Sequence, residues 1–401
     1  MSSIPSDSGL RSAVSRADHL IGQVISPALA MRLAIREGRR GAGFVSPNPL
    51  VGCTIVDRDH RLLAVGFHRK VGFDHAEIDA LKKLASREGL KGTHMYVTLE
   101  PCAHHGRTPS CARTIAPLAP ASVTYAVADP NPVAENGAGI LRAAGVTATK
   151  LSDREDIPFE ERKDLTESAE DLAEIFLHGL KSKESFVAVK VATTLDGKMG
   201  LESGESKWIT SELARKHVQL VRARYDAVLI GRKTFTEDNP SLNVRHERYP
   251  DHENKVVLFD PRGKTLASLE KSNLLTVRKP ENLFVVVAQG LAVKNASGVR
   301  LIEVPYGKDG SLAISEALVA LRSQGLASIL VEGGAGTFAA FFNARKVRRL
   351  HTYLAPSLLG GRHGVSWSSG FGVNEMSQKI QLERSRRKML GPDLYWTARV
   401  R

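Results

Sequence analysis

The chain alternates short runs of strand-forming residues with segments whose apolar residues recur at helical spacing, and it does so twice. The first series covers residues 27–150 and the second covers residues 184–401. Between them, residues 151–183 are rich in Asp and Glu and poor in strand formers, which indicates a mainly helical connection. Strands that alternate with helices form layers, so the pattern predicts two α/β domains.

Local signals place the expected elements. Residues 51–56 and 62–67 are strand-like and surround a turn-prone segment, and a helix is expected over residues 76–86. Residues 264–295 carry the weakest pattern of the chain. Residues 1–26, which are rich in Ser and Asp, are expected to form a disordered or loosely packed leader.

Composition narrows the classes of function. Three cysteines are too few for a disulfide framework, and no window is apolar enough to span a membrane, so we expect a cytoplasmic protein without a membrane partner. The 56 Lys and Arg residues against 43 Asp and Glu give a net charge of +13, which favours anionic ligands such as phosphate esters, dinucleotides or nucleic acid. The basic clusters are short and lack interleaved aromatic residues, which favours a solvated surface over a nucleic-acid interface.

Three potential metal ligands stand at the boundaries of expected elements in the first series. His75 precedes a predicted helix, Cys102 follows a predicted strand, and Cys111 opens another helix. One imidazole and two thiolates suit a catalytic zinc, which keeps its fourth position for water. Glu77 lies near enough to His75 to take a proton from water at the metal and return it to a leaving group. The set predicts a hydrolytic zinc deaminase, a class marked by His-x-Glu followed by Pro-Cys-x-x-Cys.

The loop between the two cysteines leaves alternatives open. It encloses eight residues here, whereas the class signature encloses two. His104 and His105 lie in this loop and fit either metal ligands or substrate contacts. Cys53 lies inside a strand pattern and is expected to be a core residue.

Four motifs of the first series occur together: PNPLVG at residues 47–52, HAE at 75–77, TLEPCAHHGRTPSC at 98–111 and DPNP at 129–132. Together they resemble the deaminase domain of the bifunctional riboflavin-biosynthesis deaminase/reductase family, whose pattern includes the long loop between the cysteines. The resemblance implies a cytidine-deaminase-like α/β/α fold and substrate contacts from Asn48, His68 and His104. Two departures are visible: Ser110 stands where the family usually shows Pro, and one extra residue precedes Gly137.

In the second series, polar residues and glycines follow several predicted strands, where ligands gather in α/β sheets. Residues 190–198 end a strand in polar residues, residues 204–210 precede a helix, and the polar loop 238–245 ends in Arg245. Residues 329–338 read as strand, glycine turn and helix start, which suits a phosphate at a helix N-terminus. Taken alone, the glycine turn favours a tight strand-to-helix connection over a phosphate site.

With Arg222, Thr234 and residues 355–360, these segments resemble the reductase domain of the same family, whose fold is similar to dihydrofolate reductase. The resemblance implies hydride transfer from NADPH, with Lys190 and Glu332 in catalysis. The implied NADPH contacts are Ala192, Trp208, Thr234, Gly333, Gly334, Ala335, Gly336 and Thr337. The implied substrate contacts are Asp196, Ser206, Arg222, Asp238, Leu242, Arg245 and Glu332.

Together the two resemblances cover most of residues 27–365 and imply a two-step enzyme of riboflavin synthesis. The expected reactions are zinc-dependent deamination of a diaminopyrimidinone ribosylamine phosphate and NADPH-dependent reduction of its ribosyl group to ribityl. The family further implies a homo-oligomer through the reductase domain. Two rivals remain at this stage: a nucleic-acid deaminase, favoured only by the basic charge, and a zinc-stabilised binding protein, against which Glu77, Lys190 and Glu332 argue.

Overall fold

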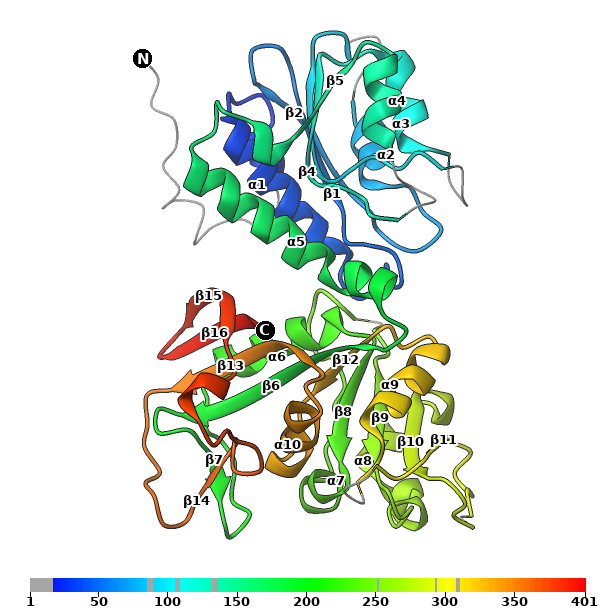
Figure 1. The fold of residues 1–401 in the computed structure, drawn as a ribbon, viewed down its shortest axis with the longest axis vertical. Coiled ribbons are helices and arrows are strands. Elements are labelled where there is room, and N and C mark those ends of the chain that lie inside the picture. Colours follow the sequence, from blue (N-terminus) through cyan, green and yellow to red (C-terminus); the bar gives the residue numbers. More distant parts are fainter. Residues whose placement is uncertain are drawn as a thin grey trace. The chain divides into compact units, whose positions relative to one another are not determined.

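The computed structural model describes residues 17–84, 90–104, 109–131, 136–250, 252–292, 294–307 and 311–401. The chain divides into two compact units, Met1–Lys181 and Ser182–Arg401, each built around one main β-sheet (Figure 1). Within the described residues, no helix combines the length and the apolar character needed to span a membrane.

The first unit contains a five-stranded sheet of order β2-β1-β3-β4-β5. Strand β1 is antiparallel to both of its neighbours, whereas β3, β4 and β5 are parallel. The strands are β1 (Gly52–Val56), β2 (Leu62–Phe67), β3 (His94–Leu99), β4 (Ser122–Val127) and β5 (Thr147–Lys150). Because β3 and β4 are parallel, the loops that follow them leave the same edge of the sheet.

Helices cover both faces of this sheet (Figure 1). On one face lie α1 (Pro27–Gly38) and α5 (Phe159–Lys181), and on the other lie α2 (Ala76–Leu81), α3 (Cys111–Ile115) and α4 (Gly137–Ala143). Each face has its own buried apolar cluster, because strands buried on both sides carry near-continuous apolar runs. The layer arrangement therefore follows from the sequence pattern of the strands.

The structure corrects two expectations in this unit. Residues 17–26 are not a disordered leader: Ala17 and Leu20 are buried in the cluster beneath α1 and α5, while residues 1–16 lie outside the described residues. The helix expected over residues 76–86 ends at Leu81, where Lys82 forms its C-cap. The acidic segment 151–183 contains α5, whose apolar side packs on α1 within the first unit.

The second unit contains a nine-stranded sheet of order β11-β10-β9-β8-β12-β6-β13-β16-β15. The strands from β11 to β13 are parallel, and β16 and β15 continue the sheet in antiparallel fashion. These strands are β6 (Phe186–Thr194), β8 (Ala227–Gly231), β9 (Lys255–Phe259), β10 (Leu283–Ala288), β11 (Arg300–Val304), β12 (Ser328–Val331), β13 (Val347–Ala355), β15 (Leu382–Leu390) and β16 (Asp393–Val400). Strands β7 (Lys198–Leu201) and β14 (Gly364–Ser366) pair separately.

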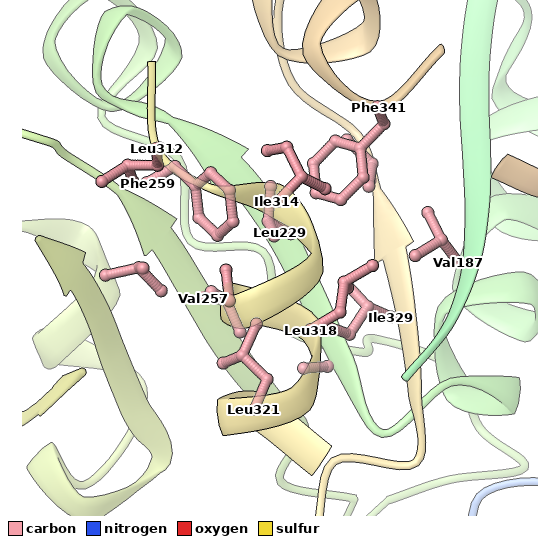
Figure 2. Close-up of a cluster of buried hydrophobic side chains, with 14 of the residues drawn as sticks. Val187, Leu229, Val257, Phe259, Leu312, Ile314, Leu318, Leu321, Ile329 and Phe341 are labelled. Carbon is pink, nitrogen blue, oxygen red and sulfur yellow. The ribbon is translucent and has the colours of Figure 1, made fainter. Parts of the chain in front are cut away.

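The helices of the second unit are α6 (Glu212–Arg224), α7 (Arg232–Asp238), α8 (Asn273–Thr276), α9 (Ile314–Ser323) and α10 (Ala335–Asn343). In its largest core cluster, Leu318 and Leu321 of α9 pack over Val257 and Ile329 of the parallel strands (Figure 2). Burial of each such side chain contributes about 1.5–3 kcal/mol. This core fixes the carboxyl ends of β6, β8 and β12 relative to one another.

Candidate active sites

Three segments of the first unit bring the potential zinc ligands together. His75 is the N-cap residue of α2, Cys102 follows β3 after a two-residue turn, and Cys111 is the first residue of α3. The Nδ1 atom of His75 lies 3.6 Å from Cys102 Sγ and 3.3 Å from Cys111 Sγ, and all three donor atoms lie within 4.8 Å of one another.

The spacing of these donor atoms fits a zinc ion. Tetrahedral zinc, with bonds of about 2.3 Å to sulfur and about 2.0–2.1 Å to nitrogen, separates its ligand atoms by about 3.5–3.8 Å. Hydrogen bonding from Cys111, followed by the His75 ring, lowers the pKa of Cys102 to about 4. Cys111 is the donor in that contact, so its own pKa is raised and the pair retains a proton that a cation would displace.

Glu77 lies in the first turn of α2 and is almost completely buried beside the ligands. Burial raises the pKa of its carboxyl group, although the neighbouring His75 opposes the rise. A buried carboxyl group with a raised pKa exchanges protons closer to neutral pH than an exposed one does. The arrangement suits a residue that takes and returns a proton.

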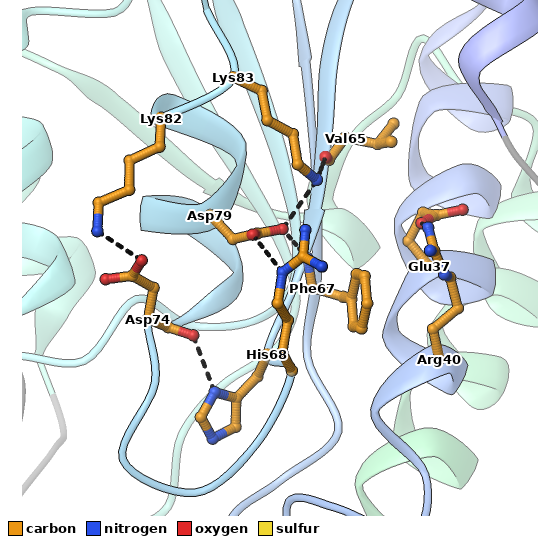
Figure 3. Close-up of polar contacts among 10 residues, drawn as sticks. Glu37, Arg40, Val65, Phe67, His68, Asp74, Asp79, Lys82 and Lys83 are labelled. Atoms are coloured by element: carbon orange, nitrogen blue, oxygen red, sulfur yellow. Dashed lines mark hydrogen bonds and ion pairs between the residues drawn. The ribbon is translucent and has the colours of Figure 1, made fainter. Parts of the chain in front are cut away.

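Asn48 and His68 lie side by side near the ligands. Asn48 Nδ2 lies 3.1 Å from His68 Nε2, and His68 Nδ1 lies 2.9 Å from the Asp74 carbonyl oxygen (Figure 3). The rings of His68 and His75 are arranged edge-on, with their centroids 5.4 Å apart. Burial lowers the pKa of His68, so a neutral ring donates from Nδ1 to Asp74 and accepts from Asn48 at Nε2.

Sequence reasoning missed Asp79, which holds α2 against β2 (Figure 3). Its carboxylate accepts hydrogen bonds from the Phe67 amide, Arg69 Nε and Lys83 Nζ at 3.1, 2.8 and 2.9 Å. These contacts fix the helix that carries Glu77. Asp79 and Lys83 are four residues apart within the predicted helix 76–86, and this spacing was the sequence signal that could have found the pair.

Glu100 is a second missed support. Its carboxylate accepts hydrogen bonds from the amides of Ala138 at 2.9 Å and Asp129 at 3.3 Å, so it joins the turn before Cys102 to the loop after β4. A Cβ atom on Gly137 would lie 1.6 Å from the Pro101 carbonyl oxygen, so only glycine allows this approach.

Of the two histidines in the cysteine loop, only His104 is among the described residues, and it is not part of the ligand group. His104 Nδ1 is buried and has no hydrogen bond to the described part of the chain. His105 lies outside the described residues.

In the second unit, a cavity of about 1230 Å³ opens beside the carboxyl ends of β6, β8 and β12. Most of the residues that the resemblance assigned to the NADPH-dependent reaction line this cavity. Those in its lining are Lys190, Ala192, Ser206, Trp208, Arg222, Thr234, Asp238, Arg245, Glu332, Gly334, Ala335, Gly336 and Thr337.

A buried charge array lies in this lining. Arg222 donates two hydrogen bonds to the Glu332 carboxylate, at 2.6 and 2.9 Å, and Lys190 Nζ lies 3.1 Å from Glu332 Oε2. Burial alone would raise the pKa of Glu332, but the charges of Arg222 and Lys190 outweigh it and hold the pKa at about 2. Glu332 is therefore a fixed negative charge that orients two cations.

The glycine turn forms the N-terminal end of α10. Gly334 is the N-cap residue with φ +61°, and a Cβ atom there would lie 3.3 Å from Thr234 Oγ1. A side chain would therefore be strained and would crowd Thr234. Trp208 and Arg215 also line the cavity, and the Arg215 guanidinium lies 4.4 Å from the centre of the Trp208 ring.

Three residues assigned by resemblance lie outside the cavity lining. Leu242 is buried in an apolar cluster with Phe235, and Gly333 packs so closely on Ile230 that a Cβ atom would approach to 2.9 Å. Asp196 is exposed and accepts hydrogen bonds from the Leu359 and Gly360 amides.

Comparison with known proteins gives two family matches. Residues 26–127 match the cytidine and deoxycytidylate deaminase zinc-binding region, and residues 185–394 match the RibD C-terminal domain. The chain is 35% identical to the riboflavin biosynthesis protein RibD of Actinobacillus pleuropneumoniae, over 91% of this chain and 93% of that one. It is 36% identical to the protein of the same name from Bacillus amyloliquefaciens, over 92% and 95% of the two chains.

Two solved structures are similar over nearly the whole chain. Acinetobacter baumannii RibD superimposes with a TM-score of 0.73 at 32% identity, covering 93% of this chain and 98% of that one. A Thermotoga maritima diaminohydroxyphosphoribosylaminopyrimidine deaminase/5-amino-6-(5-phosphoribosylamino)uracil reductase superimposes with a TM-score of 0.75 at 29% identity and the same coverage.

Proposed function

The chain belongs to the RibD family of riboflavin biosynthesis proteins, and on that premise we propose which residues carry out each of its two reactions. It is a bifunctional enzyme with a zinc-dependent deaminase unit and an NADPH-dependent reductase unit. The deaminase acts on a diaminopyrimidinone ribosylamine 5′-phosphate, and the reductase converts the ribosyl group of the deaminated product to ribityl. The substrate is thus a small phosphorylated pyrimidine.

The observation that carries the deaminase assignment is the buried Glu77 beside three donor atoms at zinc-binding distances. Zinc on His75, Cys102 and Cys111 would supply the Lewis acid that activates water. Glu77 accepts a proton from water as its oxygen bonds to the amino-bearing ring carbon, and returns it to nitrogen as the carbon–nitrogen bond breaks and ammonia leaves.

The remaining polar groups of this unit bind the substrate. Asn48 and His68 form a hydrogen-bonded pair next to His75, and we assign them to the pyrimidine ring. His104, with its buried Nδ1, is assigned to the same role.

In the reductase unit, NADPH would supply the hydride to the ring-opened ribosyl carbon. The accompanying proton comes from Lys190, which Glu332 orients from 3.1 Å. Arg222 fixes the other side of Glu332, and Asp238 and Arg245 line the same cavity for the substrate. The N-terminal end of α10, from Gly334 to Thr337, would hold the cofactor together with Ala192, Thr234 and Trp208.

We also propose a cytoplasmic homo-oligomer assembled through the second unit. Strand β15 is the edge of the nine-stranded sheet, and Met389 on it is 60% exposed. Edge strands carry unpaired backbone groups and readily pair with another chain.

Two matched variants test the assignment. Glu77→Gln should lower ammonia release by about 10²–10⁴-fold, because it removes the proton carrier, and should leave zinc bound and the reduction of deaminated substrate intact. Glu332→Gln should have the opposite pattern: ammonia release stays, while NADPH oxidation falls by about 10²–10³-fold. Ammonia release that survives in Glu77→Gln, or zinc loss from it, would contradict the role of Glu77.

A further inference from the structure

We propose that Ser110 is a positioning residue for the zinc site, because its hydroxyl group ties the turn that carries Cys102 to the helix that begins at Cys111. The inference rests on the proposed zinc-dependent deamination. Ser110 is not one of the three proposed ligands and acts through the two thiolates.

Ser110 is 2% exposed and is the N-cap residue of α3. Its Oγ atom donates a hydrogen bond of 2.8 Å to the Cys102 carbonyl oxygen and accepts one of 3.2 Å from the Arg113 amide. The hydroxyl group therefore donates to the segment that contains Cys102 and accepts from the helix that begins at Cys111.

Two backbone contacts run in parallel with this hydroxyl group. The Ala112 amide donates to the Cys102 carbonyl oxygen at 3.1 Å, and the Cys111 amide donates to Cys102 Sγ at 3.4 Å. Both amides belong to the first turn of α3, so they reach Cys102 only when that turn begins at the right place. The Ser110 cap sets this beginning.

This arrangement matters because the two cysteines enclose eight residues, and a loop of that length does not fix their distance. A zinc site binds tightly when its thiolates are held apart at the correct spacing before the metal arrives. Groups that form hydrogen bonds to metal-ligand residues and so orient them typically contribute about 10–100-fold to metal affinity. Ser110 supplies such support from a side chain, whereas the backbone amides depend on it.

The test is a zinc competition titration of the full chain against a chromophoric chelator. Ser110→Ala should weaken zinc binding by about tenfold, and added zinc should restore its rate of ammonia release. Ser110→Thr keeps the hydroxyl group and should bind zinc like the parent chain. NADPH oxidation on deaminated substrate should stay unchanged in both variants, which controls for folding of the second unit.

Thr114→Val is the matched control. Thr114 Oγ1 donates to the Ser110 carbonyl oxygen at 2.8 Å, so this variant also removes a hydroxyl group from the start of α3 but leaves the contact to Cys102 in place. Its zinc affinity should equal that of the parent chain.

Parent-like affinity in Ser110→Ala, or an equal loss in Thr114→Val, would overturn the inference while leaving the zinc site itself standing. A parent chain that binds no zinc would overturn the proposed deaminase function and this inference together.

Discussion

The two candidate active sites differ in size and in what they must hold. The deaminase site needs three donor atoms at fixed distances, and these lie within 4.8 Å of one another on the tips of a helix, a turn and a second helix. The reductase site must hold a dinucleotide and a phosphorylated substrate, and its cavity of about 1230 Å³ is lined by residues as far apart in the chain as Lys190 and Ser369. Loss of one ligand should abolish the activity of the compact metal site. In the wide cavity, the loss of activity should depend on which residue is substituted.

The same contrast appears in two buried glutamates. Burial raises the pKa of Glu77, which suits a group that accepts and releases a proton. Arg222 and Lys190 overcome the effect of burial on Glu332 and hold its pKa at about 2, which suits a permanent charge. The same side chain is therefore suited to carrying a proton in one site and to providing a fixed charge in the other, according to the charges around it.

Metal removal is the largest test of this contrast. Dialysis against a strong chelator should abolish ammonia release, because it would remove the zinc ion that we assign to His75, Cys102 and Cys111. The same sample should oxidise NADPH at the untreated rate on deaminated substrate, since the cavity of the second unit contains none of these residues. Zinc should restore the first activity, and a parallel loss of reduction would show that the two sites are not independent.

Acid unfolding tests whether Glu332 acts as a fixed negative charge, and its expected effect is smaller than that of metal removal. Its pKa is depressed from 4.5 to about 2, so its stabilising contribution is fully present above pH 4.5 and is lost as the pH falls from 4.5 towards 2. The depression corresponds to about 3 kcal/mol of free energy of unfolding near neutral pH. Denaturant titrations should therefore show the second unit losing stability in this window.

All three tryptophans, Trp208, Trp367 and Trp396, lie in the second unit, so their fluorescence reports its unfolding alone. Glu332→Gln is the control: it should be less stable at neutral pH, because Arg222 and Lys190 lose their partner, and its stability should depend less on pH in this window. Equal pH dependence in both proteins would show that other carboxylates govern the acid response.

The sequence predicted the elements that local pattern encodes and missed those that long-range contacts create. The fold class, a cytidine-deaminase-like α/β/α domain followed by a dihydrofolate-reductase-like α/β domain, is confirmed by the family matches. The β15–β16 hairpin was missed because β15 is largely exposed and carries Arg and Lys in place of alternating apolar residues. Its strand state depends on pairing with β16, which no local window reveals.

The site shows the same division. His75, Cys102 and Cys111 stand at element boundaries and could be selected from the sequence, and their role as zinc ligands stays a prediction. Glu100 could not be selected, because its partners are amides 29 and 38 residues further along the chain. Ser110 offered a weak signal, since a serine before a helix is a typical N-cap, but its bond to Cys102 depends on the fold.

Substitution of Asp196 has the smallest expected effect. It tests directly whether the position of this residue in the structure or the family resemblance predicts its role. Resemblance assigns it to the substrate, whereas in the structure it is exposed outside the cavity lining and binds the Leu359 and Gly360 amides. Asp196→Asn keeps an oxygen that can accept one of these bonds, so kcat/KM for NADPH-dependent reduction should change by no more than about twofold. Asp238→Asn changes the same atoms inside the lining and should raise the KM for the substrate more strongly. If the two variants lose activity equally, Asp196 contributes to substrate binding as the resemblance implies, although it lies outside the cavity lining.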